Sequence, residues 1–162
     1  MAHGAPRTAR VYVLTVSDTR TEENDESGKA CRELTEAAGH VVVGSSILPD
    51  DPVRVGERVK QLCAVGQIDA VLINGGTGIS SRDTTYEAVS SILQKRLDGF
   101  GELFRMLSFE EIGSKAMASR AVAGVHGNTL IFSMPGSTRA VKLAMEKLIA
   151  RELGHLTGEL NK

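Results

Sequence analysis

Runs of β-branched residues alternate with helical patterns along this chain, which limits the folds that it can adopt. Apolar, strand-like runs occupy residues 10–17, 40–47, 70–74 and 128–134, and amphipathic helical patterns lie between them. Connections that contain a helix favour parallel strands, because they cross over with right-handed geometry and cover both faces of the sheet. The sequence therefore predicts the α/β class, with a three-layer α/β/α sandwich around a mostly parallel sheet.

Several helical patterns have recognisable ends. Ser27 can cap a helix that stops at Gly39, and Asp51 with Pro52 can open the next helix at its cap and first position. Further helices are predicted, in chain order, from Thr84 or Thr85 to Leu93, from Gly99 onward, over residues 112–119 and across residues 141–149.

Length and charge limit the organisation and the partners. A chain of 162 residues with 41% hydrophobic positions suffices for one core, so we predict a flexible tail over 1–9, one domain over 10–153 and a C-terminal tail over 154–162. A formal net charge of −1 gives no reason to expect a nucleic-acid or membrane partner. The N-terminal apolar run is too short for a signal peptide or a membrane span, so we expect a cytoplasmic protein.

A glycine-rich loop, "GGTGISSRD" over 75–83, follows the third predicted strand. Its glycines allow backbone N–H groups to approach an anion closely, and the next helix would point its positive end at the same spot. Ile79 and Ser80 stand where a P-loop needs Lys and Ser or Thr, which excludes that motif. A dinucleotide fingerprint is also excluded, because it belongs after the first strand.

The rest of this loop carries both donors and a carboxylate. Phosphate donors are available from Thr77, Ser80, Ser81 and Arg82, whereas Asp83 would repel a bare phosphate. A carboxylate beside a phosphate cradle suits a divalent cation such as Mg²⁺, which binds both kinds of oxygen. Alternatively, Asp83 caps the helix that begins at Thr84, and the two roles are compatible.

A second polar turn, "MPGST", follows the last predicted strand. Pro135 and Gly136 expose Ser137, which either helps to bind an anionic group or simply caps the following helix. Asp50 is similarly open between a turn residue and a ligand. In a parallel sheet the loops after the strands meet at one rim, so we expect residues 18–26, 49–52, 75–83 and 135–137 to converge. Two turns suited to anion binding favour a ligand with several phosphates, or two phosphorylated substrates.

Four segments, taken together, carry a family resemblance. In order and spacing, "LTVSDTRTEENDESG", "NGGTGISSRDTTYEAV", "GFGELFRMLSFEEIGSKAMASRA" and "TLIFSMPGSTRAV" resemble the MoaB/Mog family of molybdenum-cofactor biosynthesis proteins, and the MoaB branch most closely. The resemblance implies the molybdopterin-binding fold. It also implies a reaction in which the phosphate of molybdopterin attacks the α-phosphate of ATP, giving adenylyl-molybdopterin and pyrophosphate.

The resemblance also implies roles for individual residues. Asp50 and Asp83 would support Mg²⁺ and the nucleotide, and so serve both as catalytic and as metal-binding residues. The implied substrate-binding residues are Gly75, Gly76, Thr77, Gly78, Ser80, Arg82, Pro135, Gly136 and Ser137, with Glu102, Ser119 and Arg120 as further contributors.

Three hypotheses about function follow. The first is an Mg²⁺-dependent molybdopterin adenylyltransferase with ATP as co-substrate, the second a molybdopterin carrier without transferase activity, and the third an oligomeric domain that senses a nucleotide. The family implies a homo-oligomer, either a trimer or a hexamer. Large hydrophobic residues favour such an interface, unless they simply face the core: Phe100, Leu103, Phe104, Met106, Leu107 and Phe109.

Overall fold

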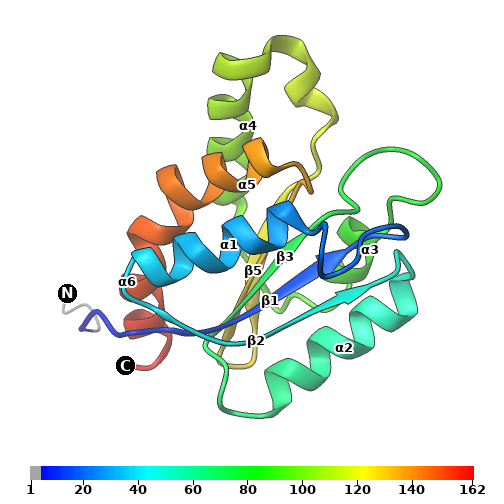
Figure 1. Ribbon diagram of the computed structural model, residues 1–162. Helices are drawn as coiled ribbons and strands as arrows, with labels where there is room; N and C mark the ends of the chain where they lie inside the picture. The colour runs from blue at the N-terminus through cyan, green and yellow to red at the C-terminus, as the bar shows by residue number, and fades with distance from the viewer. Residues whose placement is uncertain (1–4) are drawn as a thin grey trace.

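The computed structural model describes residues 5–162, and within them one six-stranded sheet forms the centre of the fold (Figure 1). The strand order is β2-β1-β3-β6-β5-β4. Strands β2, β1, β3 and β6 pair in parallel, whereas β5 is antiparallel to β6 and β4 to β5. The bounds are β1 Arg10–Val16, β2 Val41–Leu48, β3 Ala70–Asn74, β4 Lys95–Arg96, β5 Val122–His126 and β6 Thr129–Met134.

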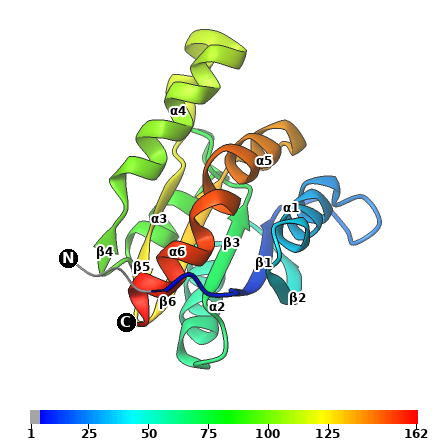
Figure 2. The same ribbon diagram turned by 90° about the vertical axis from the view of Figure 1, so that its left-hand side faces the viewer.

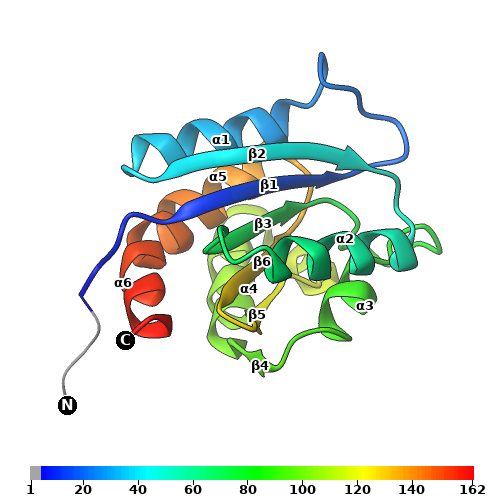
Figure 3. The same cartoon turned by 90° about the horizontal axis from the view of Figure 1, so that it is seen from below.

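Helices cover both faces of this sheet, as the predicted three-layer sandwich requires, so the fold-class prediction is confirmed. One face packs against α1 (Glu26–Ala37), α4 (Asp98–Ile112), α5 (Thr138–Ala144), the π-helical η2 (Met145–Ile149) and α6 (Ala150–Leu160). The other face packs against α2 (Pro52–Ala64) and α3 (Thr85–Ser90). Figure 3 shows the arrowheads of β1, β2 and β3 at the same end of the sheet.

Alternation along the parallel strands divides the core into two clusters. Val13 and Leu72 point into the cluster beneath α1 and α4, while their neighbours Leu14 and Ile73 point into the cluster beneath α2 and α3. All four side chains are fully buried. Successive residues of a strand face opposite sides, so the near-continuous apolar runs in the sequence serve both layers.

The antiparallel edge of the sheet was not predicted. β5 and β6 form a hairpin through Gly127, whose φ of +60° suits a tight turn, and β4 adds two residues outside them. A Cβ at Gly124 would lie 2.2 Å from the backbone oxygen of Lys95, so the strands approach too closely there for any side chain. A short strand with a central glycine gives a weak apolar pattern, which explains the omission.

Some predicted boundaries also differ from the structure. Asp25, and not Ser27, is the N-cap of α1, and its side chain accepts a hydrogen bond from the Gly28 backbone N–H. Helix α3 ends at Ser90, three residues before the predicted end, because the chain then turns into β4. The caps of α2 follow the prediction, since Asp51 accepts hydrogen bonds from the backbone of the first turn.

The predicted tails are only partly tails. Residues 1–4 lie outside the described residues, but Ala9 is fully buried and its backbone N–H donates to His40 Nδ1. Residues 154–160, expected in a C-terminal tail, are the last turns of α6, and Thr157 is buried there. No helix within residues 5–162 combines the length and the hydropathy that crossing a membrane requires.

Helix α4 extends past the end of the sheet and continues into a 3-10 helix, η1 (Gly113–Ala118), as Figure 2 shows. The buried side of α4 carries Phe100 and Phe104, which pack on the core. Phe100 lies edge-on to Phe132 of β6, with ring centroids 5.3 Å apart. This contact anchors the base of α4, while its far end forms one wall of a cleft described below.

Asp69 fixes the alignment of β1 with β3. Its carboxylate accepts hydrogen bonds from the Arg10 backbone N–H at 2.8 Å and from the Arg10 guanidinium at 3.0 and 3.1 Å. Burial on its own raises the pKa of Asp69, but the hydrogen bonds from Arg10 outweigh burial, so the pKa lies below its ordinary value of 3.8. A lowered pKa means that this carboxylate stabilises the fold above about pH 4 and loses that effect as the pH falls further.

We predict that Asp69→Asn lowers the free energy of unfolding at pH 7 by about 1.5–3 kcal/mol, because charged hydrogen bonds to Arg10 are lost. The difference from wild type should shrink as the pH falls below about 4, because the native carboxyl becomes protonated as the pH falls through its lowered pKa. Urea unfolding at each pH measures it, with Asp98→Asn, from the exposed pair with Arg96, as the control. Equal stability of Asp69→Asn and wild type at pH 7 would contradict this account.

Candidate functional site

A cleft of about 530 Å³ lies at the carboxyl end of the parallel strands. The four loops expected at this rim all reach it, so the predicted convergence is confirmed. The loops after β1, β2, β3 and β6 supply most of its lining, and the end of α4 with η1 supplies the opposite wall. Residues of these loops that line the cleft include Asp18, Arg20, Asp50, Gly75, Gly76, Thr77, Gly78, Arg82, Asp83, Pro135, Gly136 and Ser137.

The glycine loop adopts backbone conformations that only glycine accepts easily. Gly75 and Gly76 have φ values of +109° and +69°. A Cβ at Gly75 would lie 2.1 Å from the Val16 backbone oxygen, and one at Gly76 would lie 2.0 Å from Thr85 Oγ1. The loop therefore lies directly on the end of β1 and on the start of α3, with its backbone lining the cleft.

Asp50 connects three segments from a buried position. Its Oδ1 accepts hydrogen bonds from the Thr84 backbone N–H at 3.1 Å and from Thr84 Oγ1 at 2.6 Å. Its own backbone N–H donates to Asp18 Oδ1 at 2.9 Å. Thr84 is the N-cap residue of α3, and its own side chain makes no capping hydrogen bond. Asp50, from a different loop, instead accepts the hydrogen bond from the free backbone N–H at the start of this helix.

Asp83 does not cap α3, in contrast to one of its two predicted roles. Its Oδ2 accepts hydrogen bonds from the Ser80 backbone N–H at 3.0 Å and from Ser80 Oγ at 2.7 Å. The Asp83 backbone N–H donates back to the Ser80 oxygen, which closes a tight turn. Asp83 still lines the cleft, whereas Ser80 does not.

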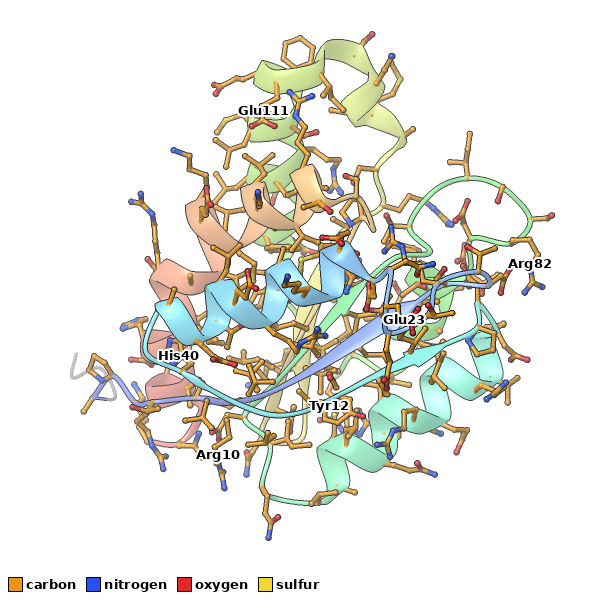
Figure 4. The ribbon with its side chains drawn as sticks, viewed as in Figure 1. Arg10, Tyr12, Glu23, His40, Arg82 and Glu111 are labelled. Atoms are coloured by element: carbon orange, nitrogen blue, oxygen red, sulfur yellow. The ribbon has the colours of Figure 1, made fainter. Side chains whose placement is uncertain are left out.

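Arg82 already has a protein partner. Its Nε and Nη2 both donate to the Asp18 carboxylate at 2.9 Å, a bidentate pair that links the loop after β1 to the glycine loop. The side-chain hydrogen bond from Arg82, followed by the backbone hydrogen bond from Asp50, lowers the pKa of Asp18. Figure 4 shows Arg82 on the loop that leads into α3. As a phosphate donor, Arg82 would have to share its guanidinium with Asp18.

Arg120 holds the glycine loop through hydrogen bonds to its backbone. Its guanidinium donates to the backbone oxygens of Gly78 and Asp83, each at 2.9 Å, and its backbone N–H donates to the Thr77 oxygen. The same guanidinium pairs with Glu87, whose pKa this hydrogen bond lowers. Arg120 is therefore placed to hold the loop, and it does not line the cleft itself.

The turn after β6 combines a helix cap with a contact to the first loop. Ser137 Oγ accepts a hydrogen bond from the Ala140 backbone N–H at 3.1 Å, so its predicted capping role is confirmed. Arg20 Nη2 donates to the Gly136 oxygen at 2.6 Å, and the same side chain pairs with Asp25 at 3.8 Å. Arg20 thus connects the loop after β1 with the turn after β6.

Four residues with predicted site roles lie away from the cleft, and several lining residues were missed. The four are Ser80, Ser81, Glu102 and Arg120. Ser119 does line the cleft, with no hydrogen-bond partner for its Oγ among the described residues. The loop around Asp18 and Arg20 was placed at the rim, but its polar residues were not assigned roles. Residues with no sequence signal for the cleft are Phe104, Ser108, Ile112 and Lys115.

The charges of the cleft are mixed. Three carboxylates, from Asp18, Asp50 and Asp83, line it together with Arg20, Arg82 and Lys115. Lys115 is exposed and makes no ion pair or hydrogen bond with another described residue. Within residues 5–162 no cluster of three His, Cys, Asp or Glu side chains could hold a metal on its own. Fewer than three such side chains are therefore available to a metal in this cleft, and its other ligands would be water, backbone oxygens or atoms of a bound molecule.

Comparison with known proteins agrees with the sequence resemblance. Residues 12–155 match the family described as "Probable molybdopterin binding domain". The chain is 54% identical over 159 residues to molybdenum cofactor biosynthesis protein B of Halalkalibacterium halodurans, covering 98% of this chain and 94% of that protein. It is 52% identical to the protein of the same name from Bacillus subtilis, with the same coverage.

Solved structures share the fold over nearly the whole chain. A crystal structure of molybdenum cofactor biosynthesis protein B has a TM-score of 0.93 and 52% identity, covering 97% of this chain and 98% of that one. The tungsten cofactor synthesizing protein MoaB of Pyrococcus furiosus has a TM-score of 0.87 and 35% identity, covering 98% and 100%. By sequence and by structure, the chain belongs to the MoaB family of molybdenum cofactor biosynthesis proteins.

Proposed function

We propose that this protein adenylylates molybdopterin with Mg²⁺ and ATP. A phosphate oxygen of molybdopterin attacks the α-phosphorus of ATP, a new P–O bond forms, and the bond from that phosphorus to the β-phosphate bridging oxygen breaks. The products are adenylyl-molybdopterin and pyrophosphate. One observation carries the proposal: the glycine loop, Asp50, Asp83 and the turn at Ser137 line a single cleft.

The chain's contribution to this reaction is alignment and charge. Gly76 and Gly78 line the cleft with backbone alone, which allows phosphate oxygens to approach closely. The turn at Gly136 and Ser137 offers a second polar contact on the same cleft, suited to the other phosphorylated substrate. Phosphoryl transfer needs in-line placement of the two phosphates more than it needs a protein nucleophile.

The donor set fits Mg²⁺ bound together with a nucleotide. In both carboxylates one oxygen is held by the protein, Asp50 Oδ1 by Thr84 and Asp83 Oδ2 by Ser80. No hydrogen bond from residues 5–162 reaches the other oxygen of either group, so both can serve as ligands. Mg²⁺ binds through one or two carboxylates plus phosphates and waters, and it would neutralise the charge that develops on the transferred group.

A molybdopterin carrier without transferase activity is the second candidate, and one observation favours it. The guanidinium groups of Arg20, Arg82 and Arg120 are all engaged by protein oxygens. Among the described cations that line the cleft, only Lys115 has no such partner. A site of this kind neutralises one phosphate more readily than a whole triphosphate. Whether the protein is a transferase or a carrier therefore depends on whether the carboxylates bind a metal that neutralises the triphosphate.

Asp83→Asn and Asp50→Asn should each reduce adenylyl transfer by about 10²-fold or more, in line with the loss of one preorganised electrostatic contact. Molybdopterin binding should be largely kept, because asparagine still accepts the hydrogen bonds from Ser80 or Thr84. Formation of adenylyl-molybdopterin and pyrophosphate from ATP, Mg²⁺ and molybdopterin measures the effect. If both groups hold one metal, the double variant should lose less than the product of the two single losses.

If the protein is a carrier, the same substitutions should strengthen molybdopterin binding. A carboxylate beside an anion is repulsive when no metal intervenes, so Asp83→Asn would then bind molybdopterin more tightly than wild type. That result, together with wild-type protein that shows no Mg²⁺-dependent ATP binding, would refute the transferase and support the carrier.

Ser137→Ala should have two separable effects. Loss of the cap to Ala140 should lower the free energy of unfolding by about 1 kcal/mol. Loss of a hydroxyl contact to a charged substrate costs about 1.5–3 kcal/mol, so molybdopterin binding should weaken by about one to two decades. Chemical denaturation and equilibrium binding measure the two. A stability loss with unchanged molybdopterin affinity would restrict Ser137 to capping.

We also propose that the protein is a homo-oligomer, a trimer or a hexamer. The predicted hydrophobic patch divides in the structure: Phe100 and Phe104 are buried, whereas Leu103, Met106 and Phe109 are 46%, 53% and 60% exposed. These three residues belong to helix α4, which projects beyond the sheet (Figure 2), and exposed apolar residues grouped on one helix favour an interface. Sedimentation at micromolar concentration should give a multiple of 17.3 kDa, and Phe109→Glu should shift it toward monomer. A wild-type monomer at that concentration would exclude the oligomer.

A further inference from the structure

Thr85, the first residue of α3, carries a buried hydroxyl that the fold itself does not use. The residue is fully buried, yet its Oγ1 has no hydrogen-bond partner among the described residues. Buried polar groups are almost always paired, because an unpaired one loses its contacts with water and gains nothing in return. Valine has nearly the same shape without that penalty. We therefore look for a hydrogen-bond partner that this hydroxyl gains when a ligand is bound.

The surroundings of this hydroxyl point to Asp50. The Thr85 backbone N–H donates to the Gly76 oxygen at 3.1 Å, which holds the start of α3 against the glycine loop. A Cβ at Gly76 would lie 2.0 Å from Thr85 Oγ1 and 2.7 Å from Asp50 Oδ2. The hydroxyl and the second carboxylate oxygen of Asp50 therefore face the same spot over Gly76, where no side chain intervenes.

Only one side of the Asp50 carboxylate is fixed by hydrogen bonds. Thr84 holds Oδ1 through its backbone N–H and its hydroxyl, whereas no hydrogen bond from residues 5–162 reaches Oδ2. Oδ2 is the oxygen available to a metal in the function proposed above. A ligating carboxylate oxygen is commonly oriented by a hydrogen-bond donor behind it, and such donors strengthen metal binding.

We propose that Thr85 is a positioning residue for Asp50, an inference that rests on the proposed function. Its hydroxyl donates a hydrogen bond to Asp50 Oδ2 when Mg²⁺ and the nucleotide are bound, and so orients that oxygen toward the metal. Thr84 and Thr85 then hold the two oxygens of one carboxylate from adjacent positions at the start of α3. The glycine at position 76 is required because any Cβ there would separate the hydroxyl from the carboxylate.

This role predicts opposite effects on stability and on binding. Thr85→Val should raise the melting temperature of the ligand-free protein, because an unpaired buried hydroxyl is removed. The same variant should bind Mg²⁺·ATP about 10-fold to 100-fold more weakly, the usual effect of losing an outer-shell partner of a metal ligand. A residue that serves only the fold would lose stability and leave binding unchanged.

Isothermal titration of the full chain with Mg²⁺·ATP, and with ATP in EDTA, tests the inference. Thr85→Val should weaken only the Mg²⁺-dependent binding, and Thr85→Ser, which keeps the hydroxyl, should bind within about threefold of wild type. Ser133→Ala is the matched control, since Ser133 Oγ is also buried and unpaired but belongs to strand β6 and not to the start of α3 beside Gly76 and Asp50. That control should bind as wild type does.

The outcomes separate this inference from the proposed function. Wild-type affinity in Thr85→Val, or equal weakening in Thr85→Ser and Thr85→Val, would overturn the role of the hydroxyl while the transferase proposal stands. Wild-type protein that binds ATP equally with and without Mg²⁺ would overturn both, because no metal would then remain for Asp50 to hold.

Discussion

The level alignment of β1, β3 and β6 is the constraint on which the site depends. Thr15, Asn74 and Met134 lie in one row across the three parallel strands, so the loops that follow them begin side by side. The Asn74 side chain donates a buried hydrogen bond to Thr15 Oγ1 at 3.1 Å, which stabilises the alignment of β1 with β3. At the opposite end, Asp69 and Arg10 fix the same register. A shift of one residue would turn each strand's side chains to the wrong face and separate the loops.

The loops at this rim are joined by side chains that also line the cleft. Asp18 binds the Asp50 backbone and Arg82, Asp50 binds Thr84, and Arg20 reaches Gly136. Asp50 and Asp83 each accept hydrogen bonds from the protein on one carboxylate oxygen, and no hydrogen bond from residues 5–162 reaches the other oxygen. An arrangement of this kind holds charged groups in place before substrate arrives, which is how preorganised sites stabilise developing charge. The family membership assigns the chain to molybdenum cofactor biosynthesis, and the geometry of the cleft supports the step that we propose for it.

The sequence predicted the parallel strands and the converging loops, because hydrophobic periodicity and turn residues are local signals. Contacts between loops leave no such signal. The sequence pointed to Asp83 as a cap for α3 since it lies next to Thr84, whereas Asp50, 34 residues earlier, performs that task. Arg82 was expected to bind phosphate, and its bidentate pair with Asp18 could not be foreseen from spacing. The β5–β6 hairpin was missed because its glycine-containing strand is short and packs against a neighbouring backbone.

We propose that the chain transfers an adenylyl group and does more than hold the pterin. Exchange of labelled pyrophosphate into ATP distinguishes the two activities, since only reversal of the transfer step places the label in ATP. Wild-type protein should catalyse this exchange when molybdopterin and Mg²⁺ are both present, and not when either is left out. Protein that binds molybdopterin and still leaves ATP unlabelled under these conditions would contradict the proposal.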